Sequence, residues 1–252
     1  MTYIRKAIIS TVAAILTFAT VSCHKDDTLY YNNLTMGNIV EGRFVSDQGN
    51  TFNIVEQICP GNLASQTRAM VLCDVLNNTE GADKEYDIRL TNFAPVLDKD
   101  AISLSSVMET DEASVQDPIH IAEIWYSGGY LNIHIKFHAK QESELKHLIN
   151  LVWSKDEEGK YILNLRHNGF GEVYSKDNAS EMYIANGYVS FPIIKFIDET
   201  EAKLILNWKW YNSPGTGYDF NTEKEYSIGY EWKRSGFEQV PKNVELKSVE
   251  IL

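Results

Sequence analysis

The sequence predicts an all-β fold, either a sandwich or a barrel, from three features. Apolar and polar residues alternate with a period of two in several short runs, as in strands with one buried and one hydrated face. Turn-forming residues such as Gly and Asp separate these runs at short intervals. Helical periodicity is not sustained over any stretch of about ten residues. Together these features favour β-sheets over helices.

The first half of the chain is predicted to contain a hairpin and two further strands. Residues 39–45 and 51–55 are apolar-rich runs, and the segment 47–50, Asp-Gln-Gly-Asn, joins them as a turn. Residues 69–76 and 85–90 supply the two further strands, with a polar turn between them. We therefore expect a small β-domain in this half.

The most regular strand pattern extends from residue 131 to residue 138. Its apolar positions are Leu131, Ile133, Ile135 and Phe137, and its polar positions are Asn132, His134, Lys136 and His138, so one face is expected to be buried and the other hydrated. The run 119–126 is its predicted partner, because Ser127, Gly128 and Gly129 form a three-residue hairpin loop that sets the register. The expected opposite pairs are Trp125 with Leu131, Ile121 with Ile135 and His120 with Lys136.

The rest of the second half follows the same pattern. Residues 149–153 and 161–165 are predicted to form a hairpin across the acidic turn 156–159. Two aromatic stripes follow near the end of the chain, and their period of two predicts core strands of a sandwich. Their members are Leu204, Leu206, Trp208 and Trp210 in the first stripe and Tyr226, Ile228, Tyr230 and Trp232 in the second.

A loop from residue 211 to residue 223 joins the two stripes and contains Pro and Gly. Loops longer than about 12 residues are often functional, and exposed aromatic rings bind sugars or partner proteins. Tyr211, Tyr218 and Phe220 do not follow the period of two, so they are the predicted ligand-binding residues. The aromatic residues of the stripes themselves are expected in the core.

The first 22 residues are predicted to be a secretory signal. A basic start with Arg5 and Lys6 precedes about fifteen apolar or small residues, fewer than the roughly 20 that span a bilayer. The alternative is an uncleaved anchor helix. Ser22 directly before Cys23 resembles a bacterial lipobox, in which the signal peptidase cuts before the Cys and its thiol carries diacylglycerol. Lipidation of Cys23 is therefore expected, and several acyl chains anchor a protein durably.

The residues beside Cys23 carry two further resemblances. Lys25, Asp26 and Asp27 resemble the signal that sends lipoproteins of Bacteroidota to the outer face of the outer membrane. Asp27 and Thr28, followed by a Leu, are similar to the O-glycosylation acceptor of that phylum, with Thr28 as the acceptor. The alternative is a solvated charged linker. The expected location is the outer membrane, with a lipid anchor, at the cell surface.

The charge of the chain excludes one class of partner. The net charge is −12, and loss of Arg5 and Lys6 with the signal takes it to −14. Nucleic-acid binding requires Lys and Arg to neutralise phosphates, so no nucleic-acid partner is expected. The membrane, through the N-terminal lipid, and a protein or glycan ligand are the expected partners.

Two cysteines follow Cys23, and they leave two alternatives open. Cys59 and Cys73 enclose a loop of about 15 residues, and a disulfide there would stabilise the fold by roughly 3 kcal/mol in an oxidising compartment. Free thiols in the core are the other alternative, because Cys packs well as a small hydrophobe.

No motif for metal, cofactor or catalysis is found in the sequence. His134 and His138 are four residues apart on a strand, roughly 13 Å, and Lys136 between them would repel a cation. The acidic clusters lack the order of a calcium loop and are expected to be solvated turns. Nucleophile elbows, phosphate-binding loops and dinucleotide fingerprints are absent from the sequence. We therefore expect a protein that is not an enzyme and has no cofactor.

The order of these segments resembles the NigD-like lipoproteins of Bacteroidota. The resemblance rests on residues 42–44 (Gly-Arg-Phe) and 94–96 (Ala-Pro-Val), on the Trp-rich second half, and on residues 190–193 (Ser-Phe-Pro-Ile). It implies a small OB-like barrel followed by an antiparallel β-sandwich, and it brings no catalytic or binding residues. The implied divisions are a signal peptide at 1–22, a lipidated tether at 23–36, an OB-like domain at 37–102, a sandwich domain at 103–236 and a C-terminal tail at 237–252.

The functional expectation is a non-enzymatic, lipid-anchored envelope protein that binds an extracellular protein or glycan. The alternative, implied by the resemblance, is self-protection against a bacteriocin, because the family name comes from a bacteriocin gene cluster. A third hypothesis is a hydrolase, which would require polar residues that converge in a cleft between the domains.

Overall fold

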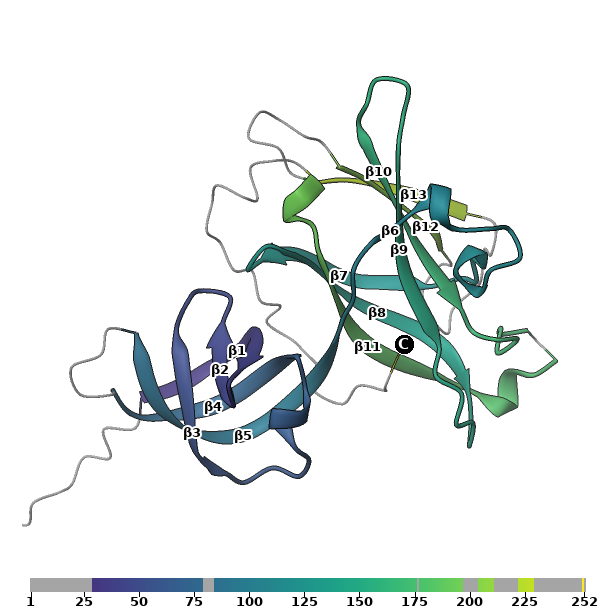
Figure 1. The fold of residues 1–252 in the computed structure, drawn as a ribbon. Helices are drawn as coiled ribbons and strands as arrows, with labels where there is room; N and C mark the ends of the chain where they lie inside the picture. The colour runs from purple at the N-terminus through teal and green to yellow at the C-terminus, as the bar shows by residue number, and fades with distance from the viewer. Residues whose placement is uncertain are drawn as a thin grey trace, which may run out of the picture.

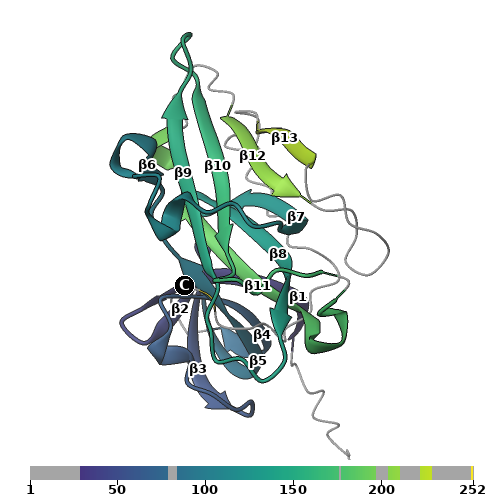
Figure 2. The ribbon, with the colours of Figure 1, turned by 90° about the vertical axis from the view of Figure 1, so that its right-hand side faces the viewer.

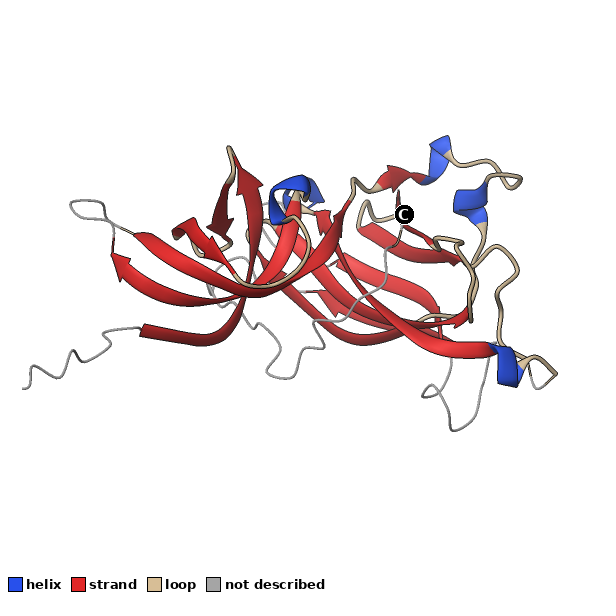
Figure 3. Cartoon of the chain, turned by 90° about the horizontal axis from the view of Figure 1, so that it is seen from below, coloured by secondary structure: helices blue, strands red, loops and turns tan. Residues whose placement is uncertain are grey.

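The computed structural model describes residues 29–78, 84–175, 177–196, 204–210, 222–228 and 251. Within these residues the chain is built from strands and five short 3₁₀ helices, η1 to η5, which confirms the all-β prediction (Figure 3). The helices are Leu63–Ser65, Leu104–Ser106, Glu112–Ser114, Ala179–Glu181 and Ile194–Phe196. No helix among the described residues is long and apolar enough to cross a membrane.

Five strands close into a barrel in the first half of the chain (Figure 1). They are β1 (Leu29–Val40), β2 (Arg43–Ser46), β3 (Thr51–Gln57), β4 (Arg68–Asn78) and β5 (Glu85–Asp98). β1 pairs with β2 and β4, β2 with β3, and β5 with β4, all antiparallel, and a parallel pairing of β3 with β5 completes the circle. Phe44, Phe52 and Ile88 are fully buried inside it. This closed five-stranded barrel agrees with the OB-like domain that the resemblance implied.

The barrel departs from the sequence prediction in the segment 39–45. A two-residue turn at Glu41 and Gly42 divides this segment between β1 and β2. Both residues have a positive φ, 51° and 78°, as in the tight turns that favour hairpins. The prediction of one continuous strand was wrong because the apolar pattern continues on both sides of the turn.

The predicted tether 23–36 is also shorter than expected. β1 already begins at Leu29, where it pairs with Val75 of β4, and Met36 is fully buried. The polar composition of this segment suggested a tether, but strand pairing uses backbone groups that every non-proline residue carries. Residues 1–28 lie outside the described part of the chain, so the predictions for Cys23, Lys25, Asp26, Asp27 and Thr28 do too.

The last part of β5 leaves the barrel and joins the sandwich. Leu97 and Asp98 pair in parallel with Val189 and Ser190 of β11 (Met182–Pro192). One eight-stranded sheet therefore runs through the whole molecule in the order β3-β2-β1-β4-β5-β11-β8-β7. Its remaining members are β7 (His120–Ser127) and β8 (Tyr130–Lys140).

A second sheet of five strands packs over β7, β8 and β11 to form the sandwich (Figure 2). Its order is β13-β12-β10-β9-β6. These strands are β6 (Ile102–Ser103), β9 (Leu148–Lys155), β10 (Tyr161–Asn168), β12 (Leu204–Trp210) and β13 (Thr222–Ile228). Apolar side chains of both sheets form one core, which includes Ile133 and Ile135 of β8 and Leu151 of β9. The predicted hairpin of β9 and β10 is confirmed, with Trp153 opposite Leu163.

The β7–β8 hairpin confirms part of the predicted register. Ile121 lies opposite Ile135 and His120 opposite Lys136, as expected, but Trp125 lies opposite Asn132 and not Leu131. A β-bulge between Ile121 and Glu123 shifts the second half of β7 by one residue. The loop accordingly contains only Gly128 and Gly129, with φ of 57° and 88°.

The polar face of β8 is buried, so the prediction of a hydrated face was wrong. Asn132, His134 and His138 are 0%, 3% and 7% exposed. Asn132 accepts a hydrogen bond from Arg68 of the barrel. The His134 ring stacks on Tyr188 of β11, and the His138 ring lies against Tyr174. The alternation indicated correctly which side chains share a face, but packing against other parts of the chain decided that both faces are buried.

Candidate functional site

A pocket of about 320 Å³ lies beside the end of β8 and the start of β11. Figure 1 shows that these strand ends lie at the side of the sandwich away from the barrel. Phe137 and Ala139 of β8 form an apolar floor, because the strand alternation directs both toward the sandwich core. The pocket is also lined by Lys140, by Ser143, Glu144, Leu145, Lys146 and His147 of the β8–β9 loop, by Glu172 of the β10–β11 loop and by Tyr183 of β11. We call this site the distal pocket.

A buried chain of hydrogen bonds forms the polar side of the distal pocket. Nδ1 of His147 lies 2.8 Å from Nε2 of His167, and Nε2 of His147 lies 3.2 Å from Oε2 of Glu172. His167 is held from its other side, where Nδ1 lies 3.2 Å from the carbonyl oxygen of Pro118. The backbone N–H of Lys140 donates to Oε2 of Glu172 at 2.8 Å. This chain of hydrogen bonds thus links β8, the β8–β9 loop, the β10–β11 loop and the segment that precedes β7.

The electrostatics of this chain keep Glu172 ionised and His167 neutral. Burial alone would raise the pKa of Glu172, but hydrogen bonds from the Lys140 backbone, Ser143 and His147, together with the charge of His147, hold that pKa below its usual value. Burial, with a smaller contribution from the neighbouring His147, lowers the pKa of His167 to about 3, although backbone hydrogen bonds act in the opposite direction. A carboxylate therefore lies beside two stacked imidazole rings whose centroids are 5.1 Å apart.

The rim of the distal pocket carries exposed apolar and charged side chains. Tyr183 is 41% exposed and Leu145 is 55% exposed. Nζ of Lys140 forms an exposed ion pair with Glu181 at 3.0 Å. A half-open pocket with an apolar floor, an aromatic rim residue and a few polar groups is the usual form of a small-ligand site.

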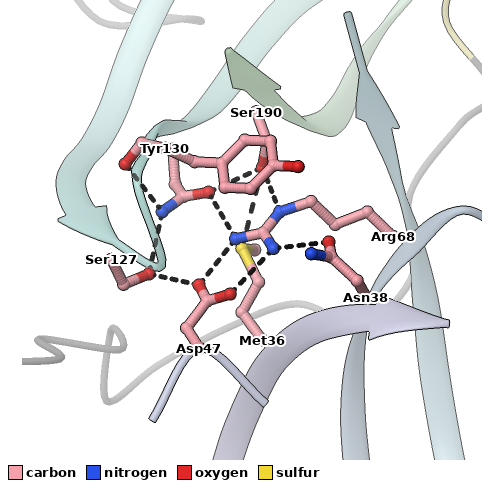
Figure 4. Close-up of polar contacts among 8 residues, drawn as sticks. Met36, Asn38, Asp47, Arg68, Ser127, Tyr130 and Ser190 are labelled. Carbon is pink, nitrogen blue, oxygen red and sulfur yellow. Dashed lines mark hydrogen bonds and ion pairs between the residues drawn. The ribbon is translucent and has the colours of Figure 1, made fainter. Parts of the chain in front are cut away.

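A second polar cluster fixes the barrel to the sandwich (Figure 4). Arg68 of β4 is fully buried, and both terminal nitrogens donate to the Asp47 carboxylate, at 2.8 and 2.6 Å. The Arg68 side chain also donates to Asn38 Oδ1 at 2.9 Å, to Asn132 Oδ1 at 3.1 Å and, through Nε, to Ser190 Oγ at 2.9 Å. All five N–H groups of the guanidinium are therefore used.

The partners of Arg68 come from both domains. Asn38 and Asp47 belong to the barrel, and Asn132 and Ser190 belong to β8 and β11 of the sandwich. Ser127 Oγ donates to Asp47 Oδ2 at 2.5 Å, and the Arg68 guanidinium lies 4.0 Å from the ring centroid of Tyr130. A buried charge pair with every donor satisfied favours one relative placement of the two domains. We interpret this cluster as structural, since its groups bind one another.

The structure places the sequence-predicted site residues as follows. Tyr211, Tyr218 and Phe220 lie outside the described residues. Cys59 and Cys73 are free cysteines in the structure, the arrangement of the free-thiol alternative. Cys73 is 4% exposed in the barrel core, and burial raises the pKa of its thiol to about 12.

No pattern in the sequence identified the residues of the distal pocket. The signal that could have found them is that His147 and His167 flank the two strands of one predicted hairpin, at its open end. Strand pairing brings such positions together, but Glu172 comes from a loop whose path no local pattern predicts. Among the described residues, no group of three or more His, Cys, Asp or Glu side chains could hold a metal ion.

Comparison with known proteins gives one family match. Residues 102–222 match the sequence model of the family described as the NigD-like C-terminal beta sandwich domain. Among curated proteins, none matches the sequence.

Several solved structures share the fold. A candidate toxin-related protein from Parabacteroides distasonis is 20% identical, with a TM-score of 0.56 over 79% of this chain and 92% of its own. A NigD-like immunity protein from Bacteroides caccae is 17% identical, with a TM-score of 0.54 over 83% of this chain and 96% of its own. A candidate lipoprotein from Bacteroides fragilis is 16% identical, with a TM-score of 0.52 over 78% and 96%. At these identities the likeness shows a common fold across most of the chain.

Proposed function

Because residues 102–222 belong to the NigD-like C-terminal β-sandwich family, we propose that this protein is a non-enzymatic, lipid-anchored envelope protein that binds an extracellular ligand in the distal pocket. The lipid is attached at Cys23 after removal of the signal, and Lys25, Asp26 and Asp27 direct the protein to the outer face of the outer membrane. A fold neighbour from Bacteroides fragilis is described as a candidate lipoprotein, which supports the anchored form.

The observation that carries the binding role is the distal pocket itself. Its volume of about 320 Å³ lies at the lower end of the range for small-molecule sites. Tyr183 and Leu145 at the rim provide apolar contact, and Lys140, Glu144 and Lys146 provide charge of both signs. Such a pocket suits one sugar unit of a glycan or one large side chain of a protein partner.

The geometry also supports a ligand that approaches from outside the cell. β1 begins at Leu29, six residues after the proposed lipid, so the anchor precedes the barrel. β8 starts at the junction with the barrel and ends at the distal pocket, a length of roughly 33 Å at 3.3 Å per residue. The barrel therefore lies between the anchor and the sandwich end that carries the pocket.

A non-enzymatic role is supported by the state of the buried polar groups. His147 contacts Glu172 and His167 through its two ring nitrogens, and Glu172 also accepts from the Lys140 backbone N–H, so neither side chain is left to attack or activate a substrate. The sequence carries no nucleophile motif of a known hydrolase class.

Binding is tested with the purified protein on a glycan array and in pull-downs from the outer surface of the producing organism. Tyr183→Ala should weaken binding of the captured ligand by about tenfold, since loss of an aromatic contact with a ligand costs over 1 kcal/mol. Ile184→Ala is the matched control, because Ile184 is equally exposed, at 43%, but points to the other side of β11. Absence of any ligand in both assays, or equal binding by the two variants, would refute the proposal.

Location is tested separately by protease treatment of intact cells. The wild-type protein should be cleaved, and a variant with Lys25, Asp26 and Asp27 replaced by Ala should be protected. Equal protection of both proteins would place the protein on the inner side of the membrane.

A second candidate function is self-protection against a bacteriocin. It is favoured by two fold neighbours, one described as a NigD-like immunity protein and one as a candidate toxin-related protein. Deletion of the gene should then raise sensitivity to a bacteriocin made by the same or a related strain. Unchanged sensitivity would remove this candidate and leave the ligand-binding role.

A further inference from the structure

We propose that the hydrogen-bond chain of Glu172, His147 and His167 binds one proton that adds a contact between the two loops of the distal pocket, so that the part of the pocket wall formed by His147 and Glu172 depends on pH. The inference rests on the proposed function only in taking this pocket as the ligand site. The protonation of the hydrogen-bond chain can be measured in the ligand-free protein.

The need for a proton follows from counting hydrogen-bond donors. Three contacts connect four groups, from the carbonyl of Pro118 through the rings of His167 and His147 to the carboxylate of Glu172, at 3.2, 2.8 and 3.2 Å. Each contact needs one hydrogen, and both ends of the chain are acceptors. Two neutral imidazole rings carry only one N–H each. A third proton must therefore lie in the chain.

The position of the third proton follows from the partners of Glu172. Its Oε2 atom accepts from the Lys140 backbone N–H as well as facing His147, which suits an ionised carboxylate. His167 is neutral, and its Nδ1 hydrogen donates to Pro118 because a carbonyl only accepts. Its Nε2 atom then accepts from Nδ1 of His147. The third proton consequently lies on Nε2 of His147, which makes this ring an imidazolium that donates on both sides.

Loss of this proton would break one contact of the chain. A neutral His147 can donate to His167 or to Glu172, but not to both, and the other contact would set two lone pairs against each other. The contact with Glu172 at 3.2 Å is longer than the one with His167 at 2.8 Å. Glu172 would then be held by the Lys140 backbone N–H and by Ser143, and no longer by His147. The β10–β11 loop would lose one of its two side-chain contacts with the β8–β9 loop, where Ser143 still binds Glu172, and both loops line the distal pocket.

Three ionisable groups near His147, namely Lys140, Asp117 and His138, have partners of their own. Lys140 Nζ pairs with Glu181, and the carboxylate of Asp117, in the segment before β7, accepts the Gly169 N–H at 2.8 Å. His138 of β8 lies against Tyr174, and burial lowers its pKa. Glu144 and Lys146 in the same loop carry opposite charges beside His147, and Tyr183 faces the pocket from β11. The three contacts of the chain therefore involve only Pro118, His167, His147 and Glu172.

The test is a pH titration of the ¹⁵N-labelled, ligand-free protein by NMR of the histidine rings. His147 should carry hydrogens on both ring nitrogens at the acid end and lose one in a single step as the pH rises. The Lys140 amide and the Tyr183 ring signals should shift in the same step.

Two variants separate this proposal from a simple structural role. Glu172→Gln removes the carboxylate and adds its own N–H donors, so His147 should no longer take up the third proton and the step should disappear. Glu181→Gln is the control, because Glu181 lies in the same loop region but pairs with the exposed Lys140 side chain, outside the hydrogen-bond chain, and the step should persist.

Three results would overturn the proposal: a single ring hydrogen on His147 at every pH where the protein is folded, Lys140 and Tyr183 signals that do not follow His147, or a step that survives Glu172→Gln. If Glu172→Gln does not fold, the wild-type titration alone decides. No ligand takes part, so a failed titration leaves the ligand-binding proposal intact, and the absence of a ligand leaves the titration valid.

Discussion

A Cβ atom placed on Gly128 would lie 2.4 Å from Oδ1 of Asp47. The β7–β8 turn of the sandwich therefore fits against the barrel only without a side chain at this position. Asp47 is the carboxylate that pairs with the buried Arg68, so the close approach of the turn and the ion pair depend on each other.

Gly128→Ala should destabilise the protein more than Gly129→Ala. Both glycines have a positive φ, 57° and 88°, so both substitutions cost about 1–2 kcal/mol in backbone strain. Only an alanine at 128 meets Asp47, since nothing lies within 4 Å of a Cβ on Gly129. Chemical denaturation should show an additional loss of about 2 kcal/mol or more for Gly128→Ala, because Asp47 must move away from Arg68. Equal losses would show that the turn can shift without disturbing the pair.

Arg68→Met should lower the free energy of unfolding by about 3–5 kcal/mol, because it leaves the Asp47 carboxylate buried without its partner. Arg89→Met is the matched control. Arg89 binds Glu56 at 2.6 Å, but the two side chains are 38% and 47% exposed, so its loss should cost at most about 1 kcal/mol. Urea denaturation measures both values, and similar losses would contradict the structural role of the junction.

The fold should lose stability as the pH falls from about 6.5 toward about 3. The pKa of His167 is about 3 in the folded protein and near 6.5 in the unfolded chain, so only the unfolded chain binds this proton in that window. Acid therefore favours unfolding, with a slope of at most about 1.4 kcal/mol per pH unit.

His167→Asn should reduce this slope, since Asn keeps one donor and one acceptor but does not titrate. The lowered pKa of Glu172 adds a loss of the same sign at lower pH, and this part should remain in the variant. Denaturation curves collected across the pH range compare the two proteins. Identical slopes would mean that His167 binds its proton equally well in both states.

Cys59 and Cys73 should differ in reactivity toward thiol reagents. Cys73 is 4% exposed and its pKa is about 12, so its thiolate is scarce and inaccessible. Cys59 is half-buried, and burial raises its pKa less. Peptide mass mapping should find label on Cys59 in the native protein and on Cys73 only after unfolding. Mapping would show neither thiol labelled if the two formed a disulfide.

Local patterns predicted the strands well. The alternation from Leu131 to Phe137 identified β8, and the turn residues around Gly128 and Gly129 identified its hairpin. These predictions hold because strand periodicity and turn conformation depend on neighbouring residues. The Glu41–Gly42 turn was missed, because the apolar pattern is the same on both sides of it.

The bulge at residue 122 and the burial of the second face of β8 could not be predicted in the same way. The bulge changes the partner of Trp125 without any change in the composition of β7. Asn132 and His134 are polar, and their burial depends on Arg68 and Tyr188, which lie more than 50 positions away in the sequence. A polar residue is buried when a distant partner satisfies it, and the sequence alone does not identify that partner.

The sequence by itself determined that this protein is an all-β chain of two parts with a strongly acidic charge, because composition and period-two alternation are local properties. The tertiary structure determined which side chains come together to form the candidate functional site. The distal pocket and its proton-binding chain combine Phe137, His147, His167 and Glu172 from two strands and two loops. Their proximity follows from how the two sheets pack and how their loops meet, and packing of this kind depends on the whole chain at once.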